Sequence, residues 1–364
     1  MANIGIIGAG TWGTALGLVL YGNGHSVTLW SAFEEDARYL DKKREHKNLP
    51  GVKLPGDMVF TASMEQAAER KDVLVLAVPS IYVRSTARKM AAFCGKGQVI
   101  VNVAKGIEED SLLTLSQVIE EELSGARVAV LSGPSHAEEV SRRVPTTCVA
   151  GAADKRLAAM VQNLFMSPEF RVYISPDVLG IELGGALKNV IALAAGIADG
   201  LGYGDNTKAA LITRGIHEIG RLGMRMGGLS ETFGGLSGIG DLIVTCASMH
   251  SRNRRAGILI GQKPCGNGNL SLSIVPRKIL QSLSHLLCHK PYHAHSIFQL
   301  WVPVVPGSLR QLSSRQYIQL VAGMDKMGSM VFKKPSLPPL HLINGPGGVL
   351  FCDGFQRIQP VPEL

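Results

Sequence analysis

Three glycines in one short turn constrain this chain more than any other feature of its sequence. An apolar run at residues 3–7 ends at Gly8, Gly10 and Gly13 follow, and helix-forming residues continue from Thr14. This order predicts a strand, a tight turn and a helix. Gly8 allows the turn, Gly10 leaves room for a pyrophosphate, and Gly13 allows the helix to pack closely on the strand. Because a helix N-terminus favours anions, we expect this turn to bind a dinucleotide rather than only to reverse the chain.

The end of the second expected strand, at residues 26–30, bears on the choice of dinucleotide. About 20 residues beyond the glycines, an acid would bind the ribose of NAD, whereas an arginine would favour NADP. The chain places Ser31, Ala32 and Phe33 there, and the acids at 34–36 come slightly later. The sequence therefore leaves NAD and NADP as alternatives.

The remaining strands indicate the fold class. Continuous apolar runs at residues 72–79 and 99–104 are typical of strands that are buried on both faces of a parallel sheet. Beyond Pro176, apolar residues recur at helical spacing as far as residue 262. We therefore expect an α/β protein with a dinucleotide-binding domain at residues 1–176 and a helical domain at residues 177–262.

Composition and charge exclude several classes of protein. The net charge is +8, but residues 1–262 carry only +1, which argues against a nucleic-acid partner. The apolar run at residues 190–198 is shorter than the ~20 residues of a membrane span, so we expect a buried helix there. No secretory signal precedes the first strand, and the six cysteines form no C-x-x-C pair. These features favour a cytoplasmic protein.

A lysine within an apolar helix is the main candidate for chemistry. Lys188 is surrounded by small and apolar residues. A buried ammonium loses its proton easily and can act as a base near neutral pH, although a lysine stem can also extend to the surface. Asp241 lies in a glycine-rich bend, and a basic cluster at residues 251–255 stands at an expected helix start. Such a cluster suits a phosphate, or it forms a solvated surface.

Together these motifs resemble the bacterial-type NAD(P)-dependent glycerol-3-phosphate dehydrogenase family. The resemblance covers about residues 3–262, in the same order and at similar spacing. It rests on the motifs at residues 8–15, 103–106, 131–137, 183–192, 240–242 and 250–255.

The resemblance implies a fold, a reaction and a set of site residues. The fold would be a Rossmann-like doubly wound sheet followed by an all-helical substrate domain like the C-terminal part of 6-phosphogluconate dehydrogenase. Lys188 would accept the proton of the 2-hydroxyl, and Lys105 would contact substrate and cofactor and lower the pKa of Lys188. The implied substrate-binding residues are Lys105, Gly133, Ser135, Lys188, Asp241, Thr245, Ser251, Arg252 and Asn253. The implied cofactor-binding residues are Gly8, Gly10, Thr11, Trp12, Gly13, Lys105, Ala137 and Arg252; no metal is implied.

After Gln262 the sequence departs from the family pattern. Residues 263–364 hold eleven of the eighteen prolines and a single glutamate, Glu363. Because proline at this density breaks helices, we expect an atypical basic tail that can be poorly ordered and a helical domain that is incomplete. A metal site is disfavoured because Pro291 interrupts any shared helix face of the candidate ligands His285, Cys288, His289, His293 and His295.

The expected function is reversible hydride transfer between C2 of sn-glycerol 3-phosphate and the nicotinamide of NAD or NADP. In the direction of dihydroxyacetone phosphate reduction, this reaction supplies glycerophospholipid synthesis. The expected partner is this small-molecule substrate, and we expect neither a nucleic-acid partner nor a membrane span. A homodimer is compatible with the sequence. One alternative is a related 3-hydroxyacid or 6-phosphogluconate type of dehydrogenase, whose substrate carries a carboxylate. Another is a catalytically impaired dinucleotide-binding protein, because of the altered C-terminus.

Overall fold

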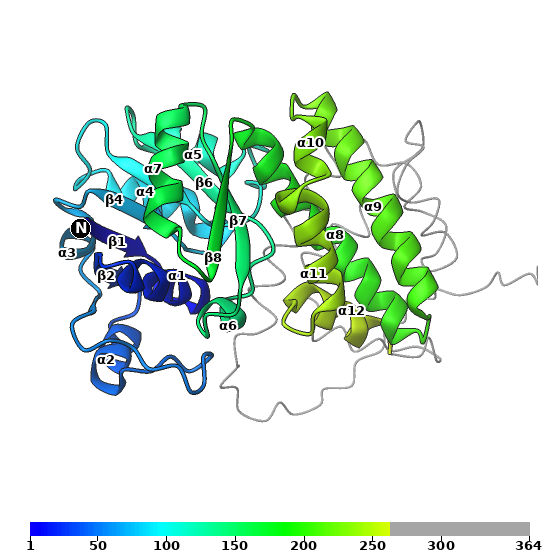
Figure 1. Cartoon of the computed structure of the whole chain (residues 1–364), viewed down its shortest axis with the longest axis horizontal. Coiled ribbons are helices and arrows are strands. Elements are labelled where there is room, and N and C mark those ends of the chain that lie inside the picture. The colour runs from blue at the N-terminus through cyan, green and yellow to red at the C-terminus, as the bar shows by residue number, and fades with distance from the viewer. Residues whose placement is uncertain (263–364) are drawn as a thin grey trace, which may run out of the picture.

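A computed structural model of the chain describes residues 1–262, which form a helix-covered β-sheet and a group of helices beside it (Figure 1). The sheet order is β3-β2-β1-β4-β5-β6-β7-β8, with only the β6–β7 pair antiparallel. This confirms the expected α/β class with a Rossmann-like sheet followed by helices. The strands are β1 (Asn3–Ile7), β2 (Ser26–Trp30), β3 (Val59–Thr61), β4 (Val73–Leu76), β5 (Val99–Asn102), β6 (Arg127–Ser132), β7 (Thr146–Gly151) and β8 (Phe170–Ser175).

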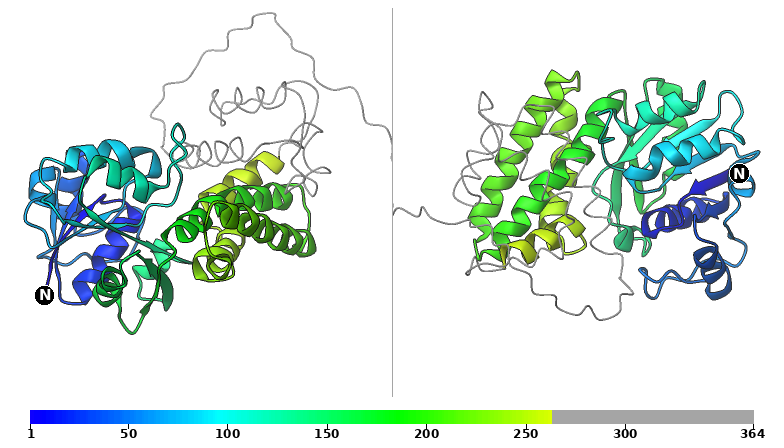
Figure 2. Two further views of the ribbon diagram at one scale, coloured as in Figure 1. Left: turned by 90° about the horizontal axis from the view of Figure 1, so that it is seen from above. Right: turned by 180° about the vertical axis from the view of Figure 1, so that it is seen from behind.

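Helices cover both faces of the sheet, which explains the continuous apolar runs. In β4, Val73 and Val75 pack on one face, whereas Leu74 and Leu76 pack on the other. The first face is covered by α1 (Thr11–Gly22), α6 (Ala137–Val140) and α7 (Lys155–Phe165). The opposite face, seen from behind in Figure 2, is covered by α3 (Met64–Ala68), α4 (Val83–Met90) and α5 (Leu115–Glu122). Helix α2 (Glu34–Lys43) follows β2.

One long helix forms the centre of the second part. The apolar run at residues 190–198 belongs to α8 (Val178–Gly200), whose 23 residues make it longer than the sequence indicated. Within the described part of the chain, α8 is the one single helix long and apolar enough to cross a membrane, and 83% of its apolar window is buried. Around it lie α9 (Asp205–Arg225), α10 (Ser230–Phe233), a π-helical turn (Leu236–Gly240), α11 (Asp241–Ala247) and α12 (Arg252–Gly261).

Glycines allow α8 and α12 to approach each other closely. A Cβ atom on Gly196 would lie 2.1 Å from the carbonyl oxygen of Arg254. A Cβ on Gly257 would lie 2.2 Å from that of Leu193. Any side chain at these positions would therefore push the two helices apart.

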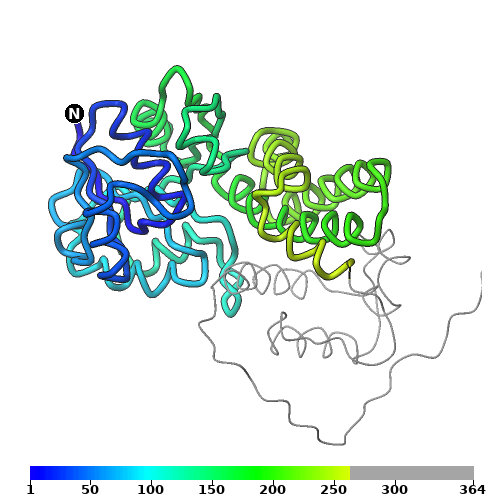
Figure 3. The backbone as a smooth tube through the Cα atoms, turned by 90° about the horizontal axis from the view of Figure 1, so that it is seen from below, coloured from blue at the N-terminus to red at the C-terminus, as the bar shows by residue number. Residues whose placement is uncertain are grey.

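The chain passes from the sheet to the helices once within the described residues, between β8 and α8 (Figure 3). The proline-rich tail at residues 263–364 lies outside the described part. So do His285, Cys288, His289, His293 and His295, on which the metal alternative depended.

Candidate active site

The glycine turn has the geometry that its sequence predicts. Gly8 has a φ of +128°, and a Cβ there would lie 2.6 Å from the carbonyl oxygen of Ala77. A Cβ on Gly13 would lie 1.9 Å from the carbonyl oxygen of Gly8. A Cβ on Gly10 would meet nothing within 4 Å. The open space at Gly10 faces the start of α1, where the strand order reverses, and it therefore fits a pyrophosphate.

Further residues surround this turn. Trp12 and Ala137 pack on the same apolar cluster, and helix α6 is in contact with α1. The side-chain amide of Asn48 donates to Thr11 Oγ1 at 3.3 Å. The ring of His46 bonds to the backbone of the glycine turn, and burial lowers the pKa of this histidine. Sequence reasoning missed Asn48 and His46 because they lie in an irregular segment without a motif.

The strand end that would read the ribose carries no acid. The backbone N–H of Ser31 donates to Thr61 at 2.9 Å, and the Ser31 hydroxyl accepts from the N–H of Phe33 at 3.2 Å. The acids at residues 34–36 form the first turn of α2 instead. This geometry keeps both NAD and NADP as candidates.

Two lysines from different parts of the molecule share one buried aspartate. Lys188, in the middle of α8 and 7% exposed, donates to Asp241 Oδ1 at 2.5 Å and to Thr245 Oγ1 at 2.9 Å. Lys105, in the loop after β5, donates to Asp241 Oδ2 at 2.7 Å. Asp241 is the first residue of α11, directly after the π-helical turn. The sequence placed these residues in separate motifs, and the fold brings them together.

This cluster has the electrostatics of a base that can lose its proton. Burial and the charge of Lys105 lower the pKa of Lys188, whereas the charge of Asp241 raises it. Burial is the largest of these effects, and the resulting pKa is about 8. Burial favours a raised pKa for Asp241, but the charges of Lys105 and Lys188 outweigh it and leave that pKa below the usual value. Lys188 can therefore exist in both protonation states near neutral pH, whereas Asp241 stays ionised.

The loop after β6 reaches the same cluster. Lys105 Nζ donates to the carbonyl oxygen of Gly133 at 2.8 Å, and the Ser135 hydroxyl donates to the same oxygen at 2.9 Å. Thr245 Oγ1 also donates to the carbonyl of Asp241, one turn earlier in α11, at 2.6 Å. Gly133, Ser135 and Thr245 thus stand around the lysine pair, and their contact with substrate stays a prediction.

The basic cluster divides into two groups. Ser251 caps α12 by accepting from the N–H of Arg254 at 3.2 Å. Arg254 itself forms an ion pair with Asp199 at 2.7 Å, so it has a structural partner. Arg252 is exposed and Asn253 half-buried at the start of the helix. Both side chains belong to the first turn of α12.

A ring contact links this helix start to the loop after β6. His250 lies directly before Ser251, and its ring centroid is 5.5 Å from that of His136. His136 follows Ser135 in the loop that reaches the lysine pair. The start of α12 therefore lies on the same side of the molecule as that loop.

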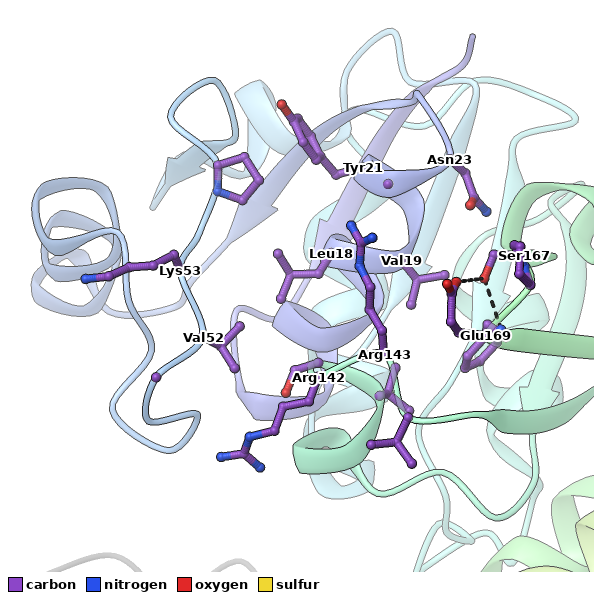
Figure 4. Close-up of a pocket in the computed structure, with 18 residues that line it drawn as sticks. Leu18, Val19, Tyr21, Asn23, Val52, Lys53, Arg142, Arg143, Ser167 and Glu169 are labelled. Carbon is purple, nitrogen blue, oxygen red and sulfur yellow. Dashed lines mark hydrogen bonds between the residues drawn. The ribbon is translucent and has the colours of Figure 1, made fainter.

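A separate cavity of about 680 Å³ lies at the other end of α1 (Figure 4). Arg143 points into it, whereas Lys53 and Arg142 point away (Figure 4). Arg142 donates to the carbonyl oxygens of Pro50 and Glu138. No residue predicted to bind substrate or cofactor lines this cavity.

Comparisons with known proteins agree with this arrangement. Residues 3–158 match the family model of the NAD-dependent glycerol-3-phosphate dehydrogenase N-terminus, and residues 177–280 match that of its C-terminus. Glycerol-3-phosphate dehydrogenase (NAD(P)+) from Agathobacter rectalis is 64% identical over 263 residues, which cover 72% of this chain and 78% of that protein. The chain belongs to the NAD-dependent glycerol-3-phosphate dehydrogenase family.

Two further members of the glycerol-3-phosphate dehydrogenase family show how far the similarity extends. The enzyme of the same name from Fusobacterium nucleatum is 55% identical over 297 residues, covering 80% of this chain and 89% of that protein. The crystal structure of glycerol-3-phosphate dehydrogenase from Coxiella burnetii is 32% identical, with a TM-score of 0.71. That match covers 87% of this chain and 98% of the Coxiella chain.

Membership of this family settles the class of the protein and its cofactor. The family consists of oxidoreductases that use NAD(P), so the enzyme class and the NAD or NADP cofactor expected from the sequence are confirmed. The recognition of the family from its motifs is confirmed as well. A role in lipid biosynthesis is consistent with the family.

Proposed function

We propose that this protein interconverts sn-glycerol 3-phosphate and dihydroxyacetone phosphate with NAD(P), and that Lys188 is its proton acceptor. The observation that carries this proposal is the buried cluster of Lys188, Asp241 and Lys105. Oxidation of a secondary alcohol needs a base beside the hydroxyl, and a buried lysine with a lowered pKa supplies one.

The residues of the cluster have distinct roles in this mechanism. A neutral Lys188 takes the proton of the C2 hydroxyl, and Asp241 then stabilises the ammonium that forms. When bound, the nicotinamide accepts the hydride that leaves C2. Lys105 contacts both molecules and favours the neutral form of Lys188 by its charge. In the reverse direction, the Lys188 ammonium returns a proton to the oxygen of the ketone.

Other residues bind the two molecules. Arg252 and Asn253 bind the substrate phosphate at the start of α12, where charge-assisted bonds hold an anion. The glycine turn holds the pyrophosphate, because the space at Gly10 is open. The further substrate contacts are Gly133, Ser135, Thr245 and Ser251, and the further cofactor contacts are Gly8, Thr11, Trp12, Gly13, Lys105, Ala137 and Arg252.

This assignment extends to the organisation of the protein. Residues 1–176 act as the dinucleotide-binding domain, and residues 177–262 act as the helical substrate domain. The glycerol 3-phosphate formed by dihydroxyacetone phosphate reduction supplies glycerophospholipid synthesis in the cytoplasm. The enzyme works as a homodimer. Size-exclusion chromatography with light scattering tests the dimer, because a monomeric mass at micromolar concentration would contradict it.

Oxidation of NADH with dihydroxyacetone phosphate, repeated with NADPH, tests the proposed reaction. We expect turnover with at least one cofactor and much less with unphosphorylated dihydroxyacetone. Turnover of 3-hydroxyisobutyrate but not of glycerol 3-phosphate would instead favour the related 3-hydroxyacid type of dehydrogenase. Binding of NADH by fluorescence, without turnover of any substrate, would indicate an impaired dinucleotide-binding protein.

A further inference from the structure

The helix that carries Lys188 also carries a buried acid, Glu182, which lies outside the lysine cluster. Glu182 is 6% exposed. Its Oε1 accepts from the side-chain amide of Asn102 and from the backbone N–H of Ser116, both at 3.0 Å. Its Oε2 accepts from the Ser116 hydroxyl at 2.5 Å. Burial raises the pKa of Glu182, although these hydrogen bonds oppose the rise. A buried carboxyl that accepts this many hydrogen bonds fixes the positions of the groups that donate them, here Asn102 and Ser116.

Asn102 connects this carboxyl to the loop that carries Lys105. Asn102 is the last residue of β5 and is 1% exposed. Its side-chain oxygen accepts from the N–H of Ala104 at 3.1 Å, and its side-chain nitrogen donates to the carbonyl of Ala104 at 3.3 Å. Glu182 therefore holds Asn102, and Asn102 holds the residue directly before Lys105.

The same helix turn also lies beside Lys105 itself. A Cβ placed on Gly185 would lie 3.6 Å from the side-chain carbons of Lys105. Lys188 is on the same helix, and the two lysines bind opposite oxygens of Asp241. The distance between the two lysines thus depends on how α8 sits against the loop after β5.

We propose that Glu182 is a positioning residue that, through Asn102, fixes Lys105 relative to Lys188. The inference rests on the proposed function of Lys188 as the base. Loss of Glu182 frees the Lys105 loop from α8. The charge of Lys105 then acts less strongly on Lys188, and Asp241 acts more strongly, so the pKa of Lys188 rises. The titratable groups that interact with Lys188 are Asp241 and Lys105, together with His136 from the loop after β6 and Cys246 from α11.

Substitutions of Glu182 test this proposal. Glu182→Leu should lower kcat by up to about 10²-fold, the loss that a displacement of about 1 Å causes. It should also move the rising limb of kcat for glycerol 3-phosphate oxidation to higher pH. Glu182→Gln should restore both, because an amide oxygen still accepts from Asn102 and the amide nitrogen can donate to the Ser116 hydroxyl. Asn102→Ala should reproduce the Glu182→Leu shift.

Asp177, which caps the N-terminus of α8, provides a matched control. It is 7% exposed, and it accepts from the N–H groups of Gly180 and Leu229 at 2.8 Å and from Thr232 Oγ1 at 2.5 Å. It therefore connects α8 to α10 rather than to the Lys105 loop. Asp177→Leu should destabilise the fold without moving the pH profile.

A second readout does not depend on turnover. The pH dependence of Lys188 labelling by acetic anhydride, followed by peptide mass spectrometry, reports the pKa of this lysine directly. We expect that pKa to be higher in Glu182→Leu and in Asn102→Ala than in the unmodified protein and in Asp177→Leu. An unchanged pKa in Asn102→Ala, or an equal shift in Asp177→Leu, would overturn the positioning role. Absence of dihydroxyacetone phosphate turnover by the unmodified protein would instead contradict the proposed function.

Discussion

At the scale of single residues, Lys188 makes the sharpest prediction. Lys188→Ala removes the base, so kcat should fall by about 10² or more, the usual contribution of general-base catalysis. The dissociation constant of NADH should stay nearly the same, because the cofactor turn lies elsewhere. Lys208→Ala is a suitable control, since Lys208 pairs with Asp199 near the C-terminal end of α8 and not with Asp241. A near-normal kcat in Lys188→Ala would remove this lysine from the mechanism.

The phosphate contacts make a second prediction at this scale. Arg252→Ala should raise KM for glycerol 3-phosphate by about 10- to 100-fold, because a hydrogen bond to a charged group is worth about 1.5–3 kcal/mol. The kcat/KM for glycerol itself should be very low in both proteins, since remote binding energy helps to position the reacting carbon. Steady-state kinetics with both substrates measures this difference. Comparable kcat/KM values for the two substrates in the unmodified protein would defeat the phosphate assignment.

At the scale of elements, the close packing of α8 and α12 supports the start of α12. Gly257→Ala should lower the free energy of unfolding by about 1–3 kcal/mol, as overpacking usually does. It should also raise KM for glycerol 3-phosphate, because α12 carries Arg252 and Asn253. Gly204→Ala is the matched control, since a Cβ there meets nothing within 4 Å. Chemical denaturation of the two variants makes the comparison, and equal stability would contradict the packing argument.

The elements differ in how far the sequence determines them. The runs that form β4 and β5 were predictable because burial on both faces requires apolar residues at successive positions. Strand β3 escaped prediction because three residues are too short for a pattern. The antiparallel pairing of β6 with β7 also escaped, because a buried run carries no direction. The Asn102–Glu182 bond was beyond reach, since its partners lie 80 residues apart.

At the scale of the whole molecule, Asp241 joins the two parts of the chain. Its carboxylate binds Lys105 from the sheet part and Lys188 from the helical part. Asp241→Asn should cost about 3–5 kcal/mol of unfolding free energy, the usual loss when one partner of a buried ion pair is removed. Glu34→Gln, in the exposed pair with Arg38, should cost only about 0–1 kcal/mol. Equal losses in thermal unfolding would show that the buried cluster does not hold the parts together.

The candidate site as a whole was predictable only in pieces. The glycine turn follows from local chemistry, because the three glycines come directly after an apolar strand and lead into a helix. From its helix alone, Lys188 could be buried or could extend to the surface. In the structure it is buried, with 7% of its surface exposed. The pairing of Lys188 with Asp241 and Lys105 could be expected only from the family motifs. Asp241 lies 53 positions from Lys188 and 136 positions from Lys105, and no local pattern connects residues so far apart.

The pH dependence of kcat/KM tests the central claim most directly. With burial lowering the pKa of Lys188 to about 8, the neutral base becomes abundant only above that pH. The kcat/KM for glycerol 3-phosphate oxidation, which reports the ionisation of the free enzyme, should therefore rise about tenfold per unit below pH ~8 and level off above it. The kcat/KM for dihydroxyacetone phosphate reduction needs the ammonium, so it should fall above the same pH. An oxidation rate that is flat between about pH 6 and 9, or that falls through this range, would contradict Lys188 as the base.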